Sequence, residues 1–167
     1  MTLDLLLIRH AKSDWGTPAQ SDHDRPLNQR GRHDAPRMGR WIVRQGLVPL
    51  EVLCSDAART RETLTLMLPH WAPAPRVSHH RELYHATPEA MIEVLEQAET
   101  SRVALIGHNP GIGLLAARLA RATPNHSRWE DYPTCAVAAL RFESDSWLDV
   151  LEGRGKVEAF AVPSDLI

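Results

Sequence analysis

An arginine and a histidine stand side by side at the end of the first apolar run of the chain. The run Leu5–Ile8 is too short for a helix of its own and is bounded by charged residues, so it indicates a buried strand. Arg9 and His10 then lie at the carboxyl end of this strand, at the edge of an open α/β sheet where ligands bind. Arginine binds phosphate oxygens through paired hydrogen bonds, and an imidazole can accept a phosphoryl group covalently. The pair suggests phosphoryl transfer through a histidine.

A second arginine, Arg59, falls in the first turn of a predicted helix, shortly after a strand that ends near Cys54. A cation at this position opposes the helix dipole, which favours anions. A bound phosphate would remove the conflict, because backbone amides and Arg59 could share it. Alternatively, Arg59 points to solvent or pairs with Asp56 or Glu62, and the segment by itself favours neither interpretation.

A second histidine follows another buried strand. Val103–Ile106 is followed by Gly107, which permits close backbone approach, and then by His108. A single histidine of this kind is usually a hydrogen-bonded core residue. Two histidines at the carboxyl ends of two strands favour a shared site, so we expect His10 and His108 to face the same edge of the sheet.

The reaction would also need an acid for the leaving group and a base for water. Glu82 follows a short strand and precedes a helix capped by Thr87-Pro88, so it can reach the same edge. The alternative for Glu82 is a solvated loop carboxylate. Ser13 and Asn28 could donate hydrogen bonds to a phosphate.

The loop between residues 12 and 26 carries further polar groups. Asp24 and Arg25 are predicted to form a local ion pair that shapes the entry to the next helix, with a direct substrate role as the less favoured alternative. Trp15 is either a platform for substrate near His10 or a loop-packing residue.

Three nearby histidines, His79, His80 and His85, could suggest a metal. No histidine pair at helical spacing and no carboxylate-histidine pattern supports one. We therefore expect no metal site and no cofactor.

The chain has the size and composition of one globular domain. With 167 residues, 43% of them hydrophobic and 24% charged, it predicts a single domain over residues 1–167. A net charge of −2 gives no basic field for nucleic acid or an acidic membrane surface. No apolar run is long enough to cross a bilayer. We therefore expect neither nucleic acid nor a membrane as a partner.

The two cysteines and the first residues of the chain indicate in which cellular compartment we expect the protein. Cys54 and Cys135 have neither metal-ligand spacing nor a disulfide framework. The chain starts directly with a strand and shows no basic and apolar signal segment. We expect two reduced thiols in a cytoplasmic protein.

Strand-like and helix-like runs alternate, which favours a largely parallel sheet flanked by helices. Pro36 interrupts one helical pattern, so the main helix there is expected to begin at Asp34 after a turn over 28–32. Two final strands are expected to form a hairpin. The expected strands cover about 3–9, 48–54, 76–78, 103–106, 136–142 and 147–151, and the expected helices cover about 34–45, 57–68, a stretch from 87 and a stretch from 110.

In combination, these motifs resemble the histidine phosphatase superfamily, the phosphoglycerate-mutase-like group named for its Arg-His-Gly motif. The resemblance is carried by Arg9-His10-Ala11, by Ser55–Thr63 around Arg59, by Glu82 and by Gly107-His108. The small bacterial phosphohistidine phosphatase branch is the most similar. Three segments point to that branch: Arg9-His10-Ala11-Lys12-Ser13, Asp24-Arg25-Pro26-Leu27 and Gly107-His108-Asn109-Pro110-Gly111.

The resemblance implies one three-layer α/β/α domain with a mostly parallel sheet. It implies that His10 takes the phosphoryl group while Arg9, Arg59 and His108 hold its oxygens, without a metal. The second ring nitrogen of His10 should donate to a backbone carbonyl, which fixes the tautomer. Glu82 would be the acid and then the base.

Two departures from the family pattern bear on the activity. Ala11 stands where the superfamily has glycine, a position that supplies no chemistry. Only a short helix and a strand separate Glu82 from His108, whereas family mutases carry a long insertion over the site. The pocket should therefore be open, which suits a phosphorylated protein side chain and favours hydrolysis over mutase chemistry.

Three functions remain open from the sequence. The first is a phosphatase for phosphohistidine in a protein, such as a phosphotransfer domain or a phosphocarrier. The second is a phosphatase for small phosphomonoesters that uses the same residues. The third, which we favour least, is a phosphate-binding module without turnover.

Overall fold

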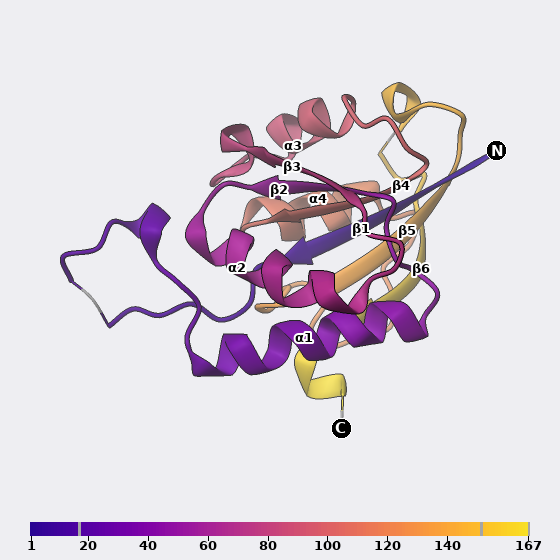
Figure 1. Ribbon diagram of the computed structural model, residues 1–167. Coiled ribbons are helices and arrows are strands. Elements are labelled where there is room, and N and C mark those ends of the chain that lie inside the picture. The colour runs from indigo at the N-terminus through magenta and orange to yellow at the C-terminus, as the bar shows by residue number, and fades with distance from the viewer. Residues whose placement is uncertain (17, 151, 167) are drawn as a thin grey trace.

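One sheet forms the centre of the protein in the computed structural model, which describes residues 1–16, 18–150 and 152–166. In these residues six strands are joined in the order β3-β2-β4-β1-β5-β6 (Figure 1). The four strands β1 to β4 run parallel, β5 runs antiparallel to β1, and β6 runs antiparallel to β5. The strands are β1 (Thr2–Arg9), β2 (Glu51–Ser55), β3 (Arg76–His80), β4 (Arg102–Gly107), β5 (Val137–Glu143) and β6 (Lys156–Ala161).

The parallel pairing brings the predicted site residues to one edge of the sheet. Arg9, the last residue of β1, lies opposite Gly107, the last residue of β4. β2, which ends at Ser55, lies on the other side of β4. His10 and His108 therefore leave neighbouring strands at the same end.

Helices cover both faces of the sheet, so the expected three-layer α/β/α architecture is confirmed (Figure 1). The helices α1 (Gln29–Arg44) and α2 (Ala58–Met67) pack on one face, and α3 (Pro88–Leu95) and α4 (Gly111–Leu119) pack on the other. The two faces of β1 are both buried. Leu5 and Leu7 join the core beneath α3 and α4, whereas Leu6 and Ile8 join the core beneath α1 and α2. This burial explains why β1 is a continuous apolar run.

The first helix begins earlier than the sequence predicted, at Gln29 instead of Asp34. Asn28 caps it, because its side-chain oxygen accepts a hydrogen bond from the Gly31 N–H at 2.9 Å. Pro36 lies inside the helix and removes one backbone donor there. The cap and the buried core face of the helix outweigh this local cost.

The final hairpin is present, with its first strand β5 as expected, but its second strand uses different residues. β5 pairs with β6, so the predicted strand over 147–151 is wrong. Trp147–Asp149 forms a 3-10 turn instead, and Leu151 lies outside the described residues. The reason is packing: the Trp147 ring is buried, and its Nε1 donates to the Thr100 carbonyl at 2.7 Å. Burial of Trp147 is thus achieved by a turn, although the local sequence pattern is typical of a strand.

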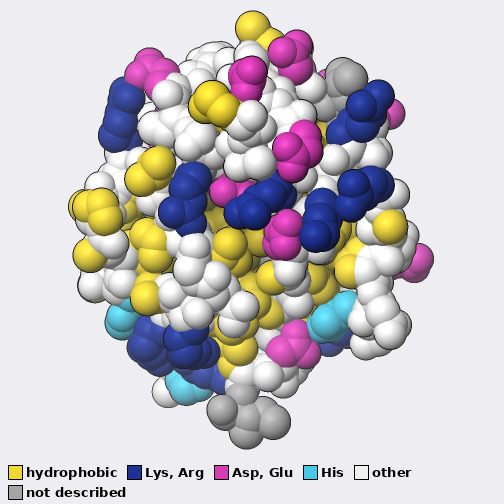
Figure 2. Space-filling view, turned by 90° about the vertical axis from the view of Figure 1, so that its right-hand side faces the viewer, with side chains coloured by type: hydrophobic (Ala, Val, Ile, Leu, Met, Phe, Trp, Pro, Cys, Tyr) yellow, Lys and Arg dark blue, Asp and Glu magenta, His cyan; other side chains and the backbone are white. Residues whose placement is uncertain are grey.

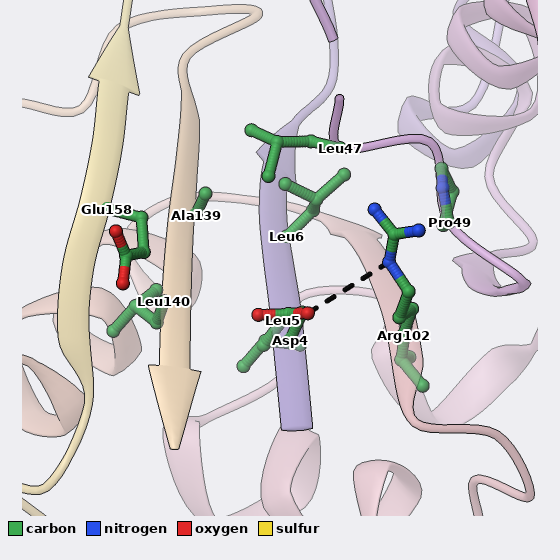
Figure 3. Close-up of a pocket in the computed structure, with 10 residues that line it drawn as sticks. Asp4, Leu5, Leu6, Leu47, Pro49, Arg102, Ala139, Leu140 and Glu158 are labelled. Atoms are coloured by element: carbon green, nitrogen blue, oxygen red, sulfur yellow. Dashed lines mark ion pairs between the residues drawn. The ribbon is translucent and has the colours of Figure 1, made fainter. Parts of the chain in front are cut away.

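The opposite end of the molecule, where β1 and β4 begin, has hollows of its own, one of about 380 Å³ lined in part by Met1, Glu99 and Trp147. Figure 2 shows this face, where basic and acidic side chains are interspersed with hydrophobic ones. A small cavity between the amino-terminal halves of β1 and β4 contains the ion pair of Asp4 and Arg102, 4.0 Å apart (Figure 3). Its volume of about 10 Å³ accommodates one water at most. Within the described residues, no helix has the length and apolar character needed to span a membrane.

Candidate active site

Residues from separate parts of the chain line a cavity of about 220 Å³ at the carboxyl edge of the parallel strands. The structure brings together four of the residues that the sequence predicted for phosphoryl transfer, Arg9, His10, Arg59 and His108. Of the lining residues, only Asp22 is acidic. The full lining is Arg9, His10, Lys12, Ser13, Trp15, Asp22, Arg25, Arg59, His85, His108, Asn109 and Thr134.

His10 is fixed in one tautomer. Its Nδ1 lies 2.7 Å from the Ala11 carbonyl oxygen, which can only accept, so Nδ1 carries the proton. The lone pair is therefore on Nε2. The backbone is held as well, since the His10 N–H donates to Gly107 and the His10 carbonyl accepts from Cys135. The ring is thus held as a nucleophile with Nε2 available.

The surroundings keep His10 neutral. The pKa of the His10 imidazole is lowered from 6.5 to about 3. Burial is the main cause, the hydrogen bond to Ala11 opposes it, and the charges of Arg59, Arg9 and Arg25 act in the same direction as burial. Only 6% of the residue is exposed. At neutral pH no proton has to leave His10 before it can attack an electrophile.

His108 lies against His10, with ring centroids 5.3 Å apart. Its Nε2 is 2.8 Å from the Ser55 hydroxyl, which in turn accepts from the Ala57 N–H. The Ser55 hydroxyl can then donate to Nε2, which leaves the proton of His108 on Nδ1. Burial, followed by His10, Arg59 and His85, lowers the pKa of His108 to about 2. His108 can therefore serve as a neutral hydrogen-bond donor.

The guanidinium groups of Arg59 and Arg9 are two of the positive charges at the cavity. Arg59 is 2% exposed, and it donates to the Asp22 carbonyl at 2.7 Å and to the Asp22 carboxylate at 3.1 Å. Arg9 donates to the Tyr132 carbonyl at 3.1 Å. Burial and the charge of Arg59 lower the pKa of Arg9. An anion bound between the two arginines would relieve this repulsion.

Three buried nitrogen atoms at this cavity have no hydrogen-bond partner. They are Arg9 Nε, Arg59 Nε and His108 Nδ1, and within the described chain no other buried side-chain nitrogen or oxygen lacks one. Buried donors are normally satisfied, because an unmade hydrogen bond is costly. Three unsatisfied donors on one cavity indicate a site built for a ligand with several acceptor oxygens.

Strained backbone also gathers here. The non-glycine residues with positive φ in the described chain are His85 at 50°, Tyr132 at 45° and Cys135 at 62°. His85 lines the cavity, the Tyr132 carbonyl holds Arg9, and the Cys135 N–H holds the His10 backbone. Such strain persists where the surrounding structure over-determines it, often at functional sites.

Arg59 has a partner that the sequence did not suggest. It pairs with Asp22, whereas Glu62 accepts from the Leu27 N–H and from Arg32. The predicted pair of Asp24 and Arg25 is likewise wrong. Arg25 binds Asp22 through Nε and NH2, both at 3.0 Å, because the 3-10 turn η1 (Asp22–Asp24) directs Asp22 inward.

The remaining predicted residues separate into two groups. Ser13 lines the cavity and accepts from Arg25 at 2.8 Å, and the Arg25 guanidinium stacks 3.5 Å from the centre of the Trp15 ring. Asn28 is the cap of α1 and does not line the cavity. Glu82 is exposed in the 3-10 turn η3 (Arg81–Leu83) and does not line the cavity either.

Sequence reasoning missed Asp22 and His85. Both lie in irregular segments that the strand-end rule does not cover, and His85 was grouped with His79 and His80 as a metal candidate. The described residues contain no cluster of three or more histidine, cysteine, aspartate or glutamate side chains that could hold a metal ion. His85 instead faces Asp22.

Comparison with known proteins agrees with this geometry. Residues 5–84 match the family model of the histidine phosphatase superfamily (branch 1). An uncharacterized protein of Mycobacterium tuberculosis is 33% identical over 164 residues, which cover 93% of this chain and 99% of the relative. A proposed phosphohistidine phosphatase SixA from Nakamurella multipartitia superposes with a TM-score of 0.80 at 26% identity, covering 98% of this chain and 97% of that one.

A second solved structure, at lower identity, supports the fold alone. The protein histidine phosphatase SixA complexed with tungstate has a TM-score of 0.75 at 20% identity, over 99% of this chain and 100% of that one. The chain belongs to the histidine phosphatase superfamily. Its solved neighbours include the small SixA branch.

Proposed function

We propose that the protein hydrolyses phosphohistidine in another protein through a covalent phosphoryl group on His10. The observation that carries this proposal is the set of three unsatisfied buried donors around an imidazole whose Nε2 is unprotonated. A phosphoryl group offers three equatorial oxygens to such donors, and it needs this charge stabilisation in its transition state.

The first step transfers the phosphoryl group to the enzyme. The His10 Nε2 lone pair attacks phosphorus in line, and the bond to the leaving group breaks. Arg9, Arg59 and His108 bind the equatorial oxygens. A water then attacks the phosphohistidine, phosphate leaves, and the electron pair returns to Nε2. The charges of the arginines supply the stabilisation, so the proposal requires no metal.

The shape of the cavity supports a macromolecular substrate. Only α3 and β4 lie between Glu82 and His108, so no long insertion covers the site. The rim carries Trp15, which is 71% exposed. An open pocket of this kind can admit a side chain that projects from a folded partner, whereas it gives little enclosure to a small metabolite. The likeness to SixA proteins supports the same substrate class.

A rate comparison tests the proposal. The purified protein is assayed on a phosphorylated phosphotransfer domain and on a set of sugar phosphates, each with His10→Ala as the control. We expect the higher kcat/KM on the phosphohistidine protein and no turnover by His10→Ala, which should remain folded. A higher kcat/KM on sugar phosphates would favour the phosphomonoesterase. Phosphate binding without turnover would favour the binding module.

A further inference from the structure

The cavity is lined by one histidine that neither attacks phosphorus nor holds the phosphoryl oxygens in the proposed reaction. His85 lines the cavity, and its side chain is 51% exposed. The residue adopts a φ of 50°, which is unfavourable for a side chain with a Cβ. An imidazole therefore faces the cavity from a loop residue in a strained conformation.

Asp22 holds the His85 ring. Nε2 of His85 is 2.9 Å from Oδ2 of Asp22, and a carboxylate only accepts, so this nitrogen carries a proton. The other charged and titratable groups that face the ring are Arg59, whose NH2 is 3.5 Å away, Tyr84 and His108. The rings of His85 and His108 stack at 5.3 Å and 27°. Nδ1 of His85 is therefore the nitrogen left for chemistry.

The carboxylate is itself firmly positioned. Arg25 binds Oδ1 of Asp22, while Arg59 and the Tyr84 hydroxyl bind Oδ2. Burial by itself would raise the pKa of Asp22, but the hydrogen bonds from Tyr84, His85 and Arg59 and the charge of Arg59 hold it well below its ordinary value. A permanently ionised carboxylate against one imidazole nitrogen is an arrangement that supports acid–base chemistry at the other nitrogen.

We propose that His85, positioned by Asp22, is the proton donor to the leaving group and then the base for water. The proposal rests on the phosphatase function proposed above and assigns this role to His85 in place of Glu82. Glu82 is exposed and does not line the cavity, whereas His85 lines it and stacks on His108, which contacts His10.

In the proposed reaction, one proton passes from His85 to the leaving group and another returns to His85 from water. When the bond from phosphorus to the leaving atom breaks, the electron pair stays on that atom, which takes a proton from Nδ1 of the His85 imidazolium. In the second step, Nδ1 of neutral His85 takes a proton from the attacking water while the nitrogen–phosphorus bond at His10 breaks. Phosphate leaves, and His85 is again an imidazolium.

The dependence of kcat/KM on the leaving group tests the role of His85 as proton donor directly. An acid matters most for a poor leaving group, so phenyl phosphate and 4-nitrophenyl phosphate are compared through kcat/KM. His85→Asn removes the acid and suits the backbone, since asparagine tolerates positive φ. We expect a loss of roughly 100-fold or more on phenyl phosphate and a far smaller loss on 4-nitrophenyl phosphate. Asp22→Asn should change the ratio of the two rates in the same direction.

Rescue and controls complete the experiment. His85→Gly leaves room for added imidazole, which should restore hydrolysis of phenyl phosphate and leave the wild-type rate unchanged. His79→Asn changes an exposed histidine on β3 outside the cavity and should leave both rates as they are.

Three results would overturn the assignment of His85: an equal loss on both substrates, no loss at all, or a loss that depends on the leaving group in Glu82→Gln instead. Failure of the phosphatase proposal is distinct from these, because the wild-type protein would then hydrolyse neither ester and would acquire no phosphoryl group on His10.

Discussion

At the scale of single residues, the centre of the site is the neutral imidazoles of His10 and His108 among guanidinium groups. His10 is held with its Nε2 unprotonated, and Arg9 and Arg59 are close enough for the charge of one to lower the pKa of the other. The sequence predicted these residues, together with His108, because each follows or closely follows a strand end. It missed Asp22 and His85, since nothing in a loop sequence states which strand end the loop will fold against.

Removing Arg59 should weaken transition-state binding. Arg59→Ala deletes one preorganised charged donor, so we expect kcat to fall roughly 100- to 1,000-fold. Steady-state kinetics on a phosphomonoester measures the change, and far-UV circular dichroism checks the fold. A fall below about threefold would contradict the role of Arg59 in binding the phosphoryl group.

The two buried histidines should make the fold sensitive to acid. Their pKa values are about 3 and 2 in the folded protein and 6.5 in an unfolded chain, so the unfolded state binds protons first as the pH falls. Stability is then complete above about pH 6.5 and declines below it, by up to about 1.4 kcal/mol per pH unit for each histidine. Urea unfolding at pH 7, 6 and 5 measures the slope.

His108→Asn supplies the control for this acid sensitivity. The variant should show a shallower decline in unfolding free energy between pH 7 and 5, whereas His33→Asn should keep the wild-type slope, because His33 is exposed on α1. Equal slopes in all three proteins would show that the buried imidazoles take up protons in the folded state.

At the scale of elements, helix and strand identity followed from the sequence better than their ends did. The run Leu5–Ile8, the capped helix after Thr87 and the strand before His108 all occur as expected. The errors arose where tertiary contacts overrode a local pattern. Burial of Trp147 replaced a strand with a turn, and the Asn28 cap extended a helix across Pro36.

The cap at Asn28 gives a prediction that separates structure from catalysis. Asn28→Ala removes the hydrogen bond to the Gly31 N–H, so we expect a loss of about 1 kcal/mol in unfolding free energy. Because Asn28 does not line the cavity, kcat/KM should stay within about twofold of the wild type at a temperature where both proteins are folded. A large kinetic loss without a loss of stability would restore Asn28 as a phosphate ligand.

At the scale of the whole molecule, the doubly covered parallel sheet collects its strand ends into one open site. The opposite face carries interspersed charges (Figure 2). The cavity between the first halves of β1 and β4 measures only about 10 Å³ (Figure 3). The fold class was predictable because alternating strands and helices leave few arrangements. The substrate could not be predicted from the sequence, because the absence of a covering insertion predicts an open pocket but does not identify the molecule that binds in it.

The open pocket predicts which acceptor takes the phosphoryl group from His10. With no insertion between Glu82 and His108 to exclude water, the phosphoenzyme should react with water and not with a second hydroxyl of the substrate. Phosphorus NMR of the protein with 3-phosphoglycerate should show, for any substrate consumed, inorganic phosphate and no 2-phosphoglycerate. Formation of the isomer would contradict the predicted preference for hydrolysis.

The most direct measurement is to trap the intermediate. The protein is mixed with a phosphorylated substrate, quenched in alkali within the first turnover, digested and sequenced by mass spectrometry. The account predicts one phosphoryl group, on His10, which forms and decays at rates that match turnover and is missing in His10→Ala. Turnover with no phosphoryl group on His10, or with the group on another residue, would contradict it.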